Sequence, residues 1–399
     1  MTTHAIDAQA DSLTNLASSA FGARVLFATD EWFAAAHNLL QPEEPVFIAD
    51  KFTDFGKWMD GWESRRKRQP GHDWCIIELG LRGTIEALDI DTAFFTGNHA
   101  PRVSIQAMSL SSDKSTWPAA LRALSDMAPS AERPMGRRAT AEELRLAEQL
   151  RSHEWTELLP FTEMGAGYPE TRHNFFRVQS QQPWTHLRVN MFPDGGIARV
   201  RVLGTVLMDW ARVPETQLID LVSSEHGGKV IKFNDAHYGH PKNLLAPGRS
   251  KTMADGWETA RKKTRPPVLE ANASTGLLQV PGKDWVVLKL GHPGVIQQVE
   301  VDTNHFKGNF PESCVVYGIA HTGSEAELIE DVDNTRLPWQ TVLPRVKLQA
   351  HRQHYFSVED GTVYAVAKPI NYVKLEMFPD GGISRLRLMG FKRTSGSRL

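Results

Sequence analysis

One stretch of the chain, Met59-Asp60-Gly61-Trp62-Glu63-Ser64-Arg65-Arg66, is present in two copies. The second copy is Met253-Ala254-Asp255-Gly256-Trp257-Glu258-Thr259-Ala260-Arg261, in which Asp-Gly-Trp-Glu is identical and a hydroxyl residue and an arginine follow. Self-similarity between distant parts of one chain is the sequence signature of a repeat architecture. The chain is therefore predicted to be a tandem duplication.

Further motifs recur in the same order, which extends the duplication over most of the chain. Gly71-His72-Asp73-Trp74 is matched by Gly282-Lys283-Asp284-Trp285, and Met191–Ile197 by Met377–Ile383. The spacing between copies changes along the chain, which indicates different insertions in the two repeats. We expect two domains of roughly 170–190 residues. The predicted parts are an N-terminal arm 1–22, a first repeat 23–208, a linker 209–228, a second repeat 229–393 and a C-terminal tail 394–399.

Strand patterns dominate both repeats. Cys75–Leu79 and Trp285–Leu290 are short apolar runs bounded by glycine, and Ile85–Ile90 and Val295–Val301 alternate apolar with polar residues. The Pro-Asp-Gly sequences near each repeat's end predict tight turns. One strong helical pattern is present, at 140–151, with a capping-box start. The prediction is an all-β protein of two tandem jelly-roll β-sandwich domains, in a motif order that resembles the galactose-binding (discoidin-like) fold.

The bulk composition excludes several classes of function. The 399 residues are 41% hydrophobic and 23% charged with a net charge of −2, so no global field attracts nucleic acid or an anionic membrane. Two non-equivalent cysteines make no disulfide framework. Neither a signal peptide nor a membrane-spanning run is found. Ser397-Arg398-Leu399 resembles the tripeptide that the peroxisomal import receptor binds, so a peroxisomal or cytoplasmic location is expected and secretion is not.

The tryptophans of the repeated motif are expected to anchor the core, but the charged residues beside them need another explanation. Asp60, Glu63 and Arg65 lie within six residues, and Asp255, Glu258 and Arg261 repeat the pattern. Burying such groups costs several kcal/mol unless they are paired. Two interpretations follow: structural salt bridges, or a site that combines an acid/base carboxylate with an arginine fork for a small carboxylate substrate.

The sequence assigns no metal ligand. It has no His-x-x-x-His on a helix, no Cys-x-x-Cys and no EF-hand loop. The sequence leaves open whether carboxylates such as Asp30, Glu31 or Asp91 hold a labile divalent cation. Serine hydrolases of the elbow type, P-loop NTPases and nicotinamide enzymes are excluded, because their fingerprints are absent.

Long stretches of both repeats resemble the allantoicase family. They include Val25–Asp30, Phe55–Ile77, Phe95–Ala107, Met253–Arg261 and Pro379–Arg387, and the similarity spans roughly residues 20–393. One departure is Trp32, where family members tend to carry phenylalanine. The resemblance implies a two-domain jelly-roll hydrolase of purine catabolism that converts allantoate and water into ureidoglycolate and urea. It also implies assembly into a homo-oligomer.

Site residues can be assigned from the chemistry of allantoate, which carries one carboxylate and two ureido arms. Proton transfer is assigned to Glu63, Glu258 or His72. The aspartate that follows His72, Asp73, is taken as structural, because the second repeat keeps it as Asp284 but has Lys283 in place of the histidine. Substrate binding is assigned to charged and amide side chains of both repeats: Arg65, Arg66, Arg261, Asp30, Glu31, Asn98, Asn309, Asp60 and Asp255. Direct displacement and elimination followed by hydration both stay open. The competing interpretations are an inactive relative and a non-catalytic, lectin-like binding module.

Overall fold

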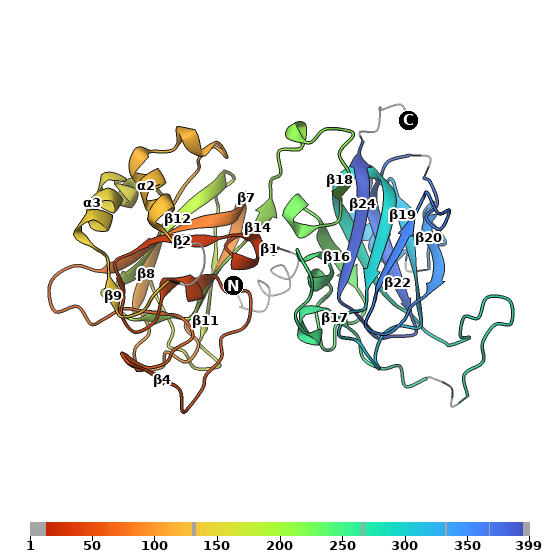
Figure 1. Ribbon diagram of the computed structural model, residues 1–399, viewed down its shortest axis with the longest axis horizontal. Coiled ribbons are helices and arrows are strands. Elements are labelled where there is room, and N and C mark those ends of the chain that lie inside the picture. Colours follow the sequence, from red (N-terminus) through yellow and green to blue (C-terminus); the bar gives the residue numbers. More distant parts are fainter. Residues whose placement is uncertain are drawn as a thin grey trace. The chain divides into compact units, whose positions relative to one another are not determined.

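The computed structural model describes residues 13–129, 133–264, 266, 268–331, 333–366 and 368–393. The chain divides into two compact units, Met1–Leu207 and Met208–Leu399 (Figure 1). Most of the expected N-terminal arm and the C-terminal tail with Ser397-Arg398-Leu399 lie outside the described residues. Within the described ranges, no helix is long and apolar enough to cross a membrane.

The first unit is built around one long strand, β7 (Asp73–Asp91), which belongs to both layers of a sandwich. Its first half pairs with β2 and β12, its second half with β14 and β11. The sequence had predicted two strands here. They form one continuous strand. The glycines between them allow close contact with neighbouring backbone, since a Cβ on Gly80 would lie 2.6 Å from the Phe21 carbonyl oxygen. The remaining strands of this unit's main sheet are β1, β8 and β10.

The second unit repeats the arrangement around β18 (Asp284–Asp302). The first half of β18 pairs with β16 and β22, the second half with β24 and β21. In both units every pairing in the main sheet is antiparallel. The prediction of an all-β tandem of two sandwich domains is confirmed.

The other strands of the two main sheets have the following bounds: β1 Thr14–Asn15, β2 Arg24–Ala28, β8 Arg102–Met108, β10 Thr156–Glu163, β11 His173–Arg177, β12 Pro183–Phe192 and β14 Arg199–Val206 in the first unit, and β15 Ile219–Asp220, β16 Lys229–Phe233, β19 Ser313–Ile319, β20 Gln340–Lys347, β21 Gln353–Ser357, β22 Ile370–Phe378 and β24 Arg385–Lys392 in the second. Short two-stranded sheets pair β3 (Asp30–Glu31) with β9 (Arg137–Arg138), β4 (Phe52–Thr53) with β5 (Gly56–Lys57), β6 (Trp62–Glu63) with β13 (Gly196–Ile197), and β17 (Trp257–Glu258) with β23 (Gly382–Ile383). The 3-10 turns are η1 Ser19–Phe21, η2 Ala36–Leu40, η3 Lys114–Thr116, η4 Ser152–Glu154, η5 Trp210–Arg212, η6 Ser224–His226, η7 Pro241–Leu245 and η8 Met253–Asp255.

Each unit has its own apolar core between its layers, with a repeated tryptophan inside it. Trp62 and Trp257 are both 0% exposed. Each indole N–H donates to a backbone carbonyl: that of Trp62 to Asp30 at 2.8 Å and that of Trp257 to Asp235 at 2.9 Å. A buried tryptophan is most stable when its N–H is satisfied in this way. The repeated Asp-Gly-Trp motif therefore fixes the sandwich interior, as predicted.

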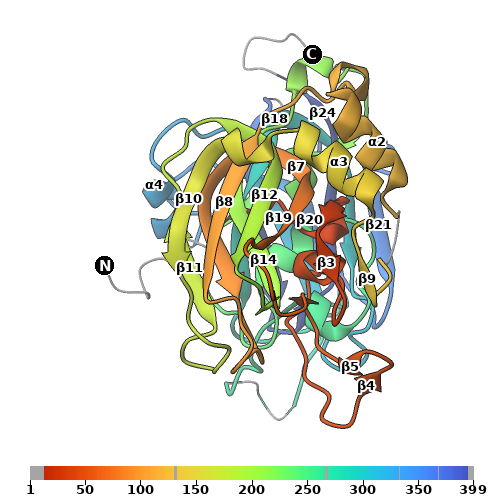
Figure 2. The ribbon, with the colours of Figure 1, turned by 90° about the vertical axis from the view of Figure 1, so that its left-hand side faces the viewer.

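Two helices cover an outer face of the first unit (Figure 2). The predicted helix is confirmed as α3 (Ala141–Gln149), which begins with a capping box between Thr140 and Glu143. A second helix, α2 (Ala119–Met127), was not predicted from the sequence; it packs with α3 on β2 and the first half of β7. In the second unit α4 (Glu325–Glu330) is a shorter helix that was also not predicted.

The segment 209–228, expected to be a linker, contributes secondary structure to the second unit. Its strand β15 pairs with β24, and Leu221 and Val222 are 0% exposed in the core. The strand was not anticipated because it is only two residues long and repeat similarity lapses there.

Candidate active site

The duplicated Trp-Glu pair lies in the same structural position in both units. Trp62-Glu63 forms β6, which pairs with the strand that follows the Pro-Asp-Gly turn of that unit, and Trp257-Glu258 does the same. Successive side chains of a strand point to opposite faces. Because the tryptophan enters the core, the glutamate points away from it, and Glu63 and Glu258 are half-buried.

Each of these glutamates is held by an asparagine from the next repeated motif. Asn98 Nδ2 donates to Glu63 Oε1 at 2.7 Å, and Asn309 Nδ2 donates to Glu258 Oε1. Burial raises the pKa of Glu63 above its ordinary value, and the bond from Asn98 partly opposes that rise. A carboxylate held in one orientation in a partly desolvated place suits proton transfer.

In the second unit this pair lies in a cavity of about 540 Å³. The cavity brings together three residues that the sequence analysis had assigned separately: Glu258, Arg261 and Asn309. The other lining residues are Tyr238, Thr259, Leu278, Val280, Gly308, Phe310, Glu312, Lys347, Leu348, Pro379, Asp380 and Gly381. Arg261 is exposed, and its guanidinium forms no ion pair with any described residue. A small anionic molecule in this cavity would therefore meet a cation, a carboxylate and an amide.

Arg66 of the first unit holds the position of Arg261, since each directly precedes a lysine that binds a turn aspartate. Lys67 N donates to Asp194 Oδ2 and Lys262 N to Asp380 Oδ2, both at 2.7 Å. Arg66 is exposed and is unpaired within the described ranges.

Arg65, assigned as a substrate ligand, is instead bound to another predicted site residue. Its Nε and Nη2 donate to Asp30 Oδ2 at 2.9 and 2.7 Å, and its guanidinium lies 4.2 Å from the ring centroid of Trp32. In the second unit Ala260 replaces this arginine, and the side-chain carboxylate of Asp235 accepts only the Ala260 backbone N–H among the bonds described. Arg65 and Asp30 form a structural ion pair particular to the first repeat.

Three further carboxylates assigned to substrate binding are engaged inside the protein. Asp60 binds Arg199 at 2.9 Å, and Asp255 binds Arg385 at the same distance. Both arginines are only 2% exposed, so each carboxylate neutralises a buried cation. Glu31 is 1% exposed and binds Arg133 at 2.8 Å. Asp60 and Asp255 thus form the salt bridges of the first interpretation, and Glu31 forms a further buried ion pair.

His72 lies in a different polar cluster from the glutamate–asparagine pair. Its Nε2 lies 3.0 Å from Asn190 Oδ1, and its ring is 4.4 Å from that of Phe192. Burial, the largest effect, lowers the pKa of His72. The adjacent Asp73 is 0% exposed and pairs with Lys67 at 2.7 Å, which agrees with a structural role.

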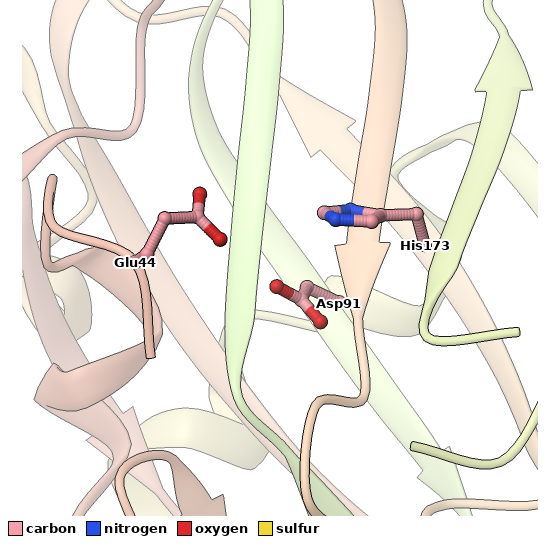
Figure 3. Close-up of side chains that lie close together, drawn as sticks. All are labelled: Glu44, Asp91 and His173. Atoms are coloured by element: carbon pink, nitrogen blue, oxygen red, sulfur yellow. The ribbon is translucent and has the colours of Figure 1, made fainter. Parts of the chain in front are cut away.

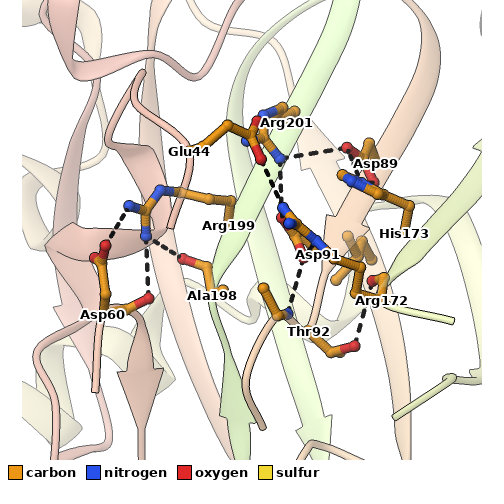
Figure 4. A network of polar contacts seen from close by, with 12 residues as sticks. Glu44, Asp60, Asp89, Asp91, Thr92, Arg172, His173, Ala198, Arg199 and Arg201 are labelled. Atoms are coloured by element: carbon orange, nitrogen blue, oxygen red, sulfur yellow. Dashed lines mark hydrogen bonds and ion pairs between the residues drawn. The ribbon is translucent and has the colours of Figure 1, made fainter. Parts of the chain in front are cut away.

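One group of side chains has the composition of a metal site, but arginines already neutralise its carboxylates. Glu44, Asp91 and His173 place donor atoms within 4.8 Å of one another (Figure 3). Arg172 donates to both Asp91 and Glu44, and Arg201 also binds Glu44, at 2.6 Å (Figure 4). Two guanidinium groups among these carboxylates already supply the positive charge that a cation would bring. Since Asp30 and Glu31 also bind arginines, none of the three carboxylates proposed for a divalent cation is unpaired.

Comparison with known proteins gives a consistent result. The model of the allantoicase repeat matches residues 14–207 and again 219–393. A probable allantoicase of Pseudomonas savastanoi pv. phaseolicola is 40% identical over 380 residues, which cover 95% of this chain and 96% of that protein. The crystal structure of allantoicase from Saccharomyces cerevisiae superposes with a TM-score of 0.68 at 30% identity, covering 98% of this chain and 99% of that one. The chain belongs to the allantoicase family. The resemblance noted in the sequence is thereby confirmed.

The two allantoicase repeats differ in the segment that follows the shared motif. Residues 68–72 connect Lys67 to β7, whereas residues 263–283 connect Lys262 to β18. The longer segment supplies Leu278 and Val280 to the cavity wall. Its backbone is anchored across the cavity, because Leu278 N donates to Glu312 Oε1 at 3.0 Å.

The arginines that neutralise the predicted carboxylates were not among the residues predicted from the sequence. Arg199 and Arg385 had a detectable signal, since both follow the repeated Gly-Gly-Ile sequence at the same spacing in each allantoicase repeat. Arg133 had none, because it lies in the insertion of the first repeat. Leu278 and Val280 likewise lie in sequence that has no counterpart in the other repeat.

Proposed function

We propose that this protein hydrolyses allantoate to ureidoglycolate and urea in the cavity of its second repeat. One observation carries the proposal: Glu258, Asn309 and Arg261 line one cavity of about 540 Å³. The family relationship supports the choice of substrate, because two relatives that are each 40% identical over 95% of this chain are named as probable allantoicases.

Arg261 is assigned to the substrate carboxylate. A guanidinium presents two parallel N–H donors that match a carboxylate. Arg261 is available for this because no described carboxylate pairs with it, unlike Arg65, which Asp30 holds. Lys347 also lines the cavity and adds a second positive charge.

Glu258 is assigned to proton transfer. One of its oxygens accepts the bond from Asn309, and Oε2 accepts no hydrogen bond from the described residues. The fixed oxygen orients the group, and the open oxygen can accept a proton from water or donate one to the leaving nitrogen. The reaction breaks one C–N bond of the central carbon, places the hydroxyl of water there and returns a proton to urea. Direct displacement and elimination followed by hydration both satisfy this balance.

The experiment is to measure urea and ureidoglycolate released from allantoate by the purified protein. Equal molar amounts of the two products are expected. Folded protein that releases neither would contradict the proposal and favour an inactive relative or a binding module. Homo-oligomeric assembly and binding to the peroxisomal import receptor stay predictions.

A further inference from the structure

Arg188 of β12 is a buried cation on the outer face of the first repeat's sheet. It is 7% exposed. Its Nε donates to Asn190 Oδ1 at 2.7 Å and its Nη1 to Ser152 Oγ at 2.9 Å. Its guanidinium also lies 3.8 Å from the ring centroid of Trp74. All of these neighbours are neutral.

No described carboxylate binds this guanidinium. The amide of Asn190 donates to Ser104 and to Gln106, which are also neutral. Burial without a counter-charge lowers the pKa of Arg188 to about 10. A buried charge is normally paired, so this cluster departs from the rule.

The second repeat shows what the same position looks like when it is neutralised. Lys374 corresponds to Arg188 and Glu376 to Asn190, because each pair stands at the same distance before the repeated Met-Phe-Pro sequence. Glu376 binds Lys374 at 3.2 Å, and it also binds Lys283, which corresponds to His72, at 2.9 Å. At this position the second repeat therefore has a carboxylate, Glu376, and the first repeat has an amide, Asn190.

One nitrogen of the guanidinium stays open as a donor. Arg188 Nη2 donates no hydrogen bond to any described residue, whereas Nε and Nη1 are both engaged, and 7% of the residue is exposed. The half-buried ring of His72 shares Asn190 Oδ1 with Arg188 and flanks it. Next to these lies Phe192, whose ring contacts the exposed Phe161.

We propose that Arg188, flanked by Asn190 and His72, binds a small carboxylate anion that takes the place of the Glu376 carboxylate of the second repeat. The open Nη2 edge donates to the carboxylate, and a neutral imidazole adds a further donor or acceptor. A carboxylate fits better than a spherical halide because a guanidinium edge and a carboxylate are both planar and match in spacing. The site is separate from the cavity of the second repeat and does not depend on the proposed function.

The test uses the full chain carrying Arg261→Gln, which removes the cation assigned to the cavity. Its thermal unfolding is followed with sodium glycolate, with sodium chloride at equal ionic strength, and with neutral acetamide. Glycolate is expected to raise Tm by roughly 4 °C for each tenfold excess over its dissociation constant, beyond any effect of chloride. Acetamide is expected to have no effect. Repeating the titration with allantoate shows whether the site also accepts that carboxylate.

Two variants locate the effect. Asn190→Glu rebuilds the arrangement of the second repeat, so it should raise Tm without ligand and abolish the response to glycolate. Arg188→Met should abolish the response as well, and it serves as the test if Asn190→Glu does not fold. Lys374→Met is the matched control in the second repeat and should respond like the parent. A parent without a glycolate-specific rise, or a response that persists in both first-repeat variants, would overturn the proposal.

Discussion

Asn309 donates its amide N–H to one oxygen of the Glu258 carboxylate. The equivalent bond, from Asn98 to Glu63, has been retained in the first repeat at 2.7 Å. The duplicated sequence therefore conserves a carboxylate–amide pair and not only the tryptophan that anchors the core. In the second repeat this pair lies beside Arg261 in a cavity.

Removing the amide should impair turnover more than binding. In Asn309→Ala the Glu258 carboxylate loses the bond that fixes its orientation, and misplacement of a catalytic group costs roughly 10- to 100-fold in rate. We expect kcat for urea release to fall by about that factor, with KM changed little. Asn98→Ala is the matched variant of the first repeat. An equal loss of kcat in Asn98→Ala would contradict the assignment of the site to the second repeat.

The aspartates that neutralise buried arginines should contribute to stability. Arg199 is 2% exposed and the Asp60 side chain 13%, so Asp60→Asn leaves a buried cation without its carboxylate. Such a change costs about 3–5 kcal/mol. Asp255→Asn should cost less, because the Asp255 side chain is 33% exposed. Thermal unfolding measures both.

Asp209→Asn is the control for these two variants. Its ion pair with Arg212 is exposed on both sides, so its loss should cost less than about 1 kcal/mol. If Asp60→Asn unfolded at the same temperature as Asp209→Asn, the pair with Arg199 would not stabilise the fold.

The longer segment of the second repeat should be needed for substrate affinity. We expect that replacing residues 263–283 by the residues 68–72 of the first repeat removes Leu278 and Val280 from the wall and exposes the half-buried Glu258 more fully to water. Electrostatic interactions weaken when water enters. KM for allantoate should rise at least roughly tenfold, with the circular dichroism of the folded protein retained. Unchanged KM would mean that the segment does not close the site.

His186 should make the first unit sensitive to acid. Burial lowers the pKa of His186 to about 4 from an ordinary value of about 6.5. As the pH falls from about 6.5 to 4, the unfolded chain binds a proton there that the folded chain does not bind, so stability is lost over that window. The loss is on the order of 3 kcal/mol.

A comparison of two histidine variants checks this prediction. The difference in Tm between pH 7 and pH 4.5 should shrink in His186→Gln, because that residue no longer titrates. His153→Gln is the control, since the His153 side chain is 64% exposed. If both variants keep the pH dependence of the parent, His186 is not responsible for it.

The sequence predicted the fold correctly because a duplication doubles each local signal. The Asp-Gly-Trp and Pro-Asp-Gly motifs mark a core anchor and a turn wherever they occur, and each occurs twice. The sequence did not show that 75–79 and 85–90 belong to one strand, β7. A strand can exchange its hydrogen-bond partners without a turn, and such an exchange leaves no local pattern.

Part of the candidate site could be found from the sequence for a similar reason. Glu258, Arg261 and Asn309 belong to repeated motifs, and the cavity brings them together. Their role could not be distinguished from that of Asp255, because the arginine that neutralises Asp255 is Arg385, far away in the sequence. Such pairs depend on the tertiary fold, whereas the local pattern of charges is the same for a salt bridge and for a catalytic group.

The most direct test of the account compares Glu258→Gln with Glu63→Gln in the release of urea from allantoate. The two glutamates occupy equivalent positions, and both substitutions keep the size of the side chain and the hydrogen bond to the asparagine. Loss of a general acid or base costs roughly 100- to 10,000-fold in rate. The account predicts a loss of that size in Glu258→Gln and a loss of less than roughly tenfold in Glu63→Gln, with both proteins folded. Full turnover by Glu258→Gln would contradict it.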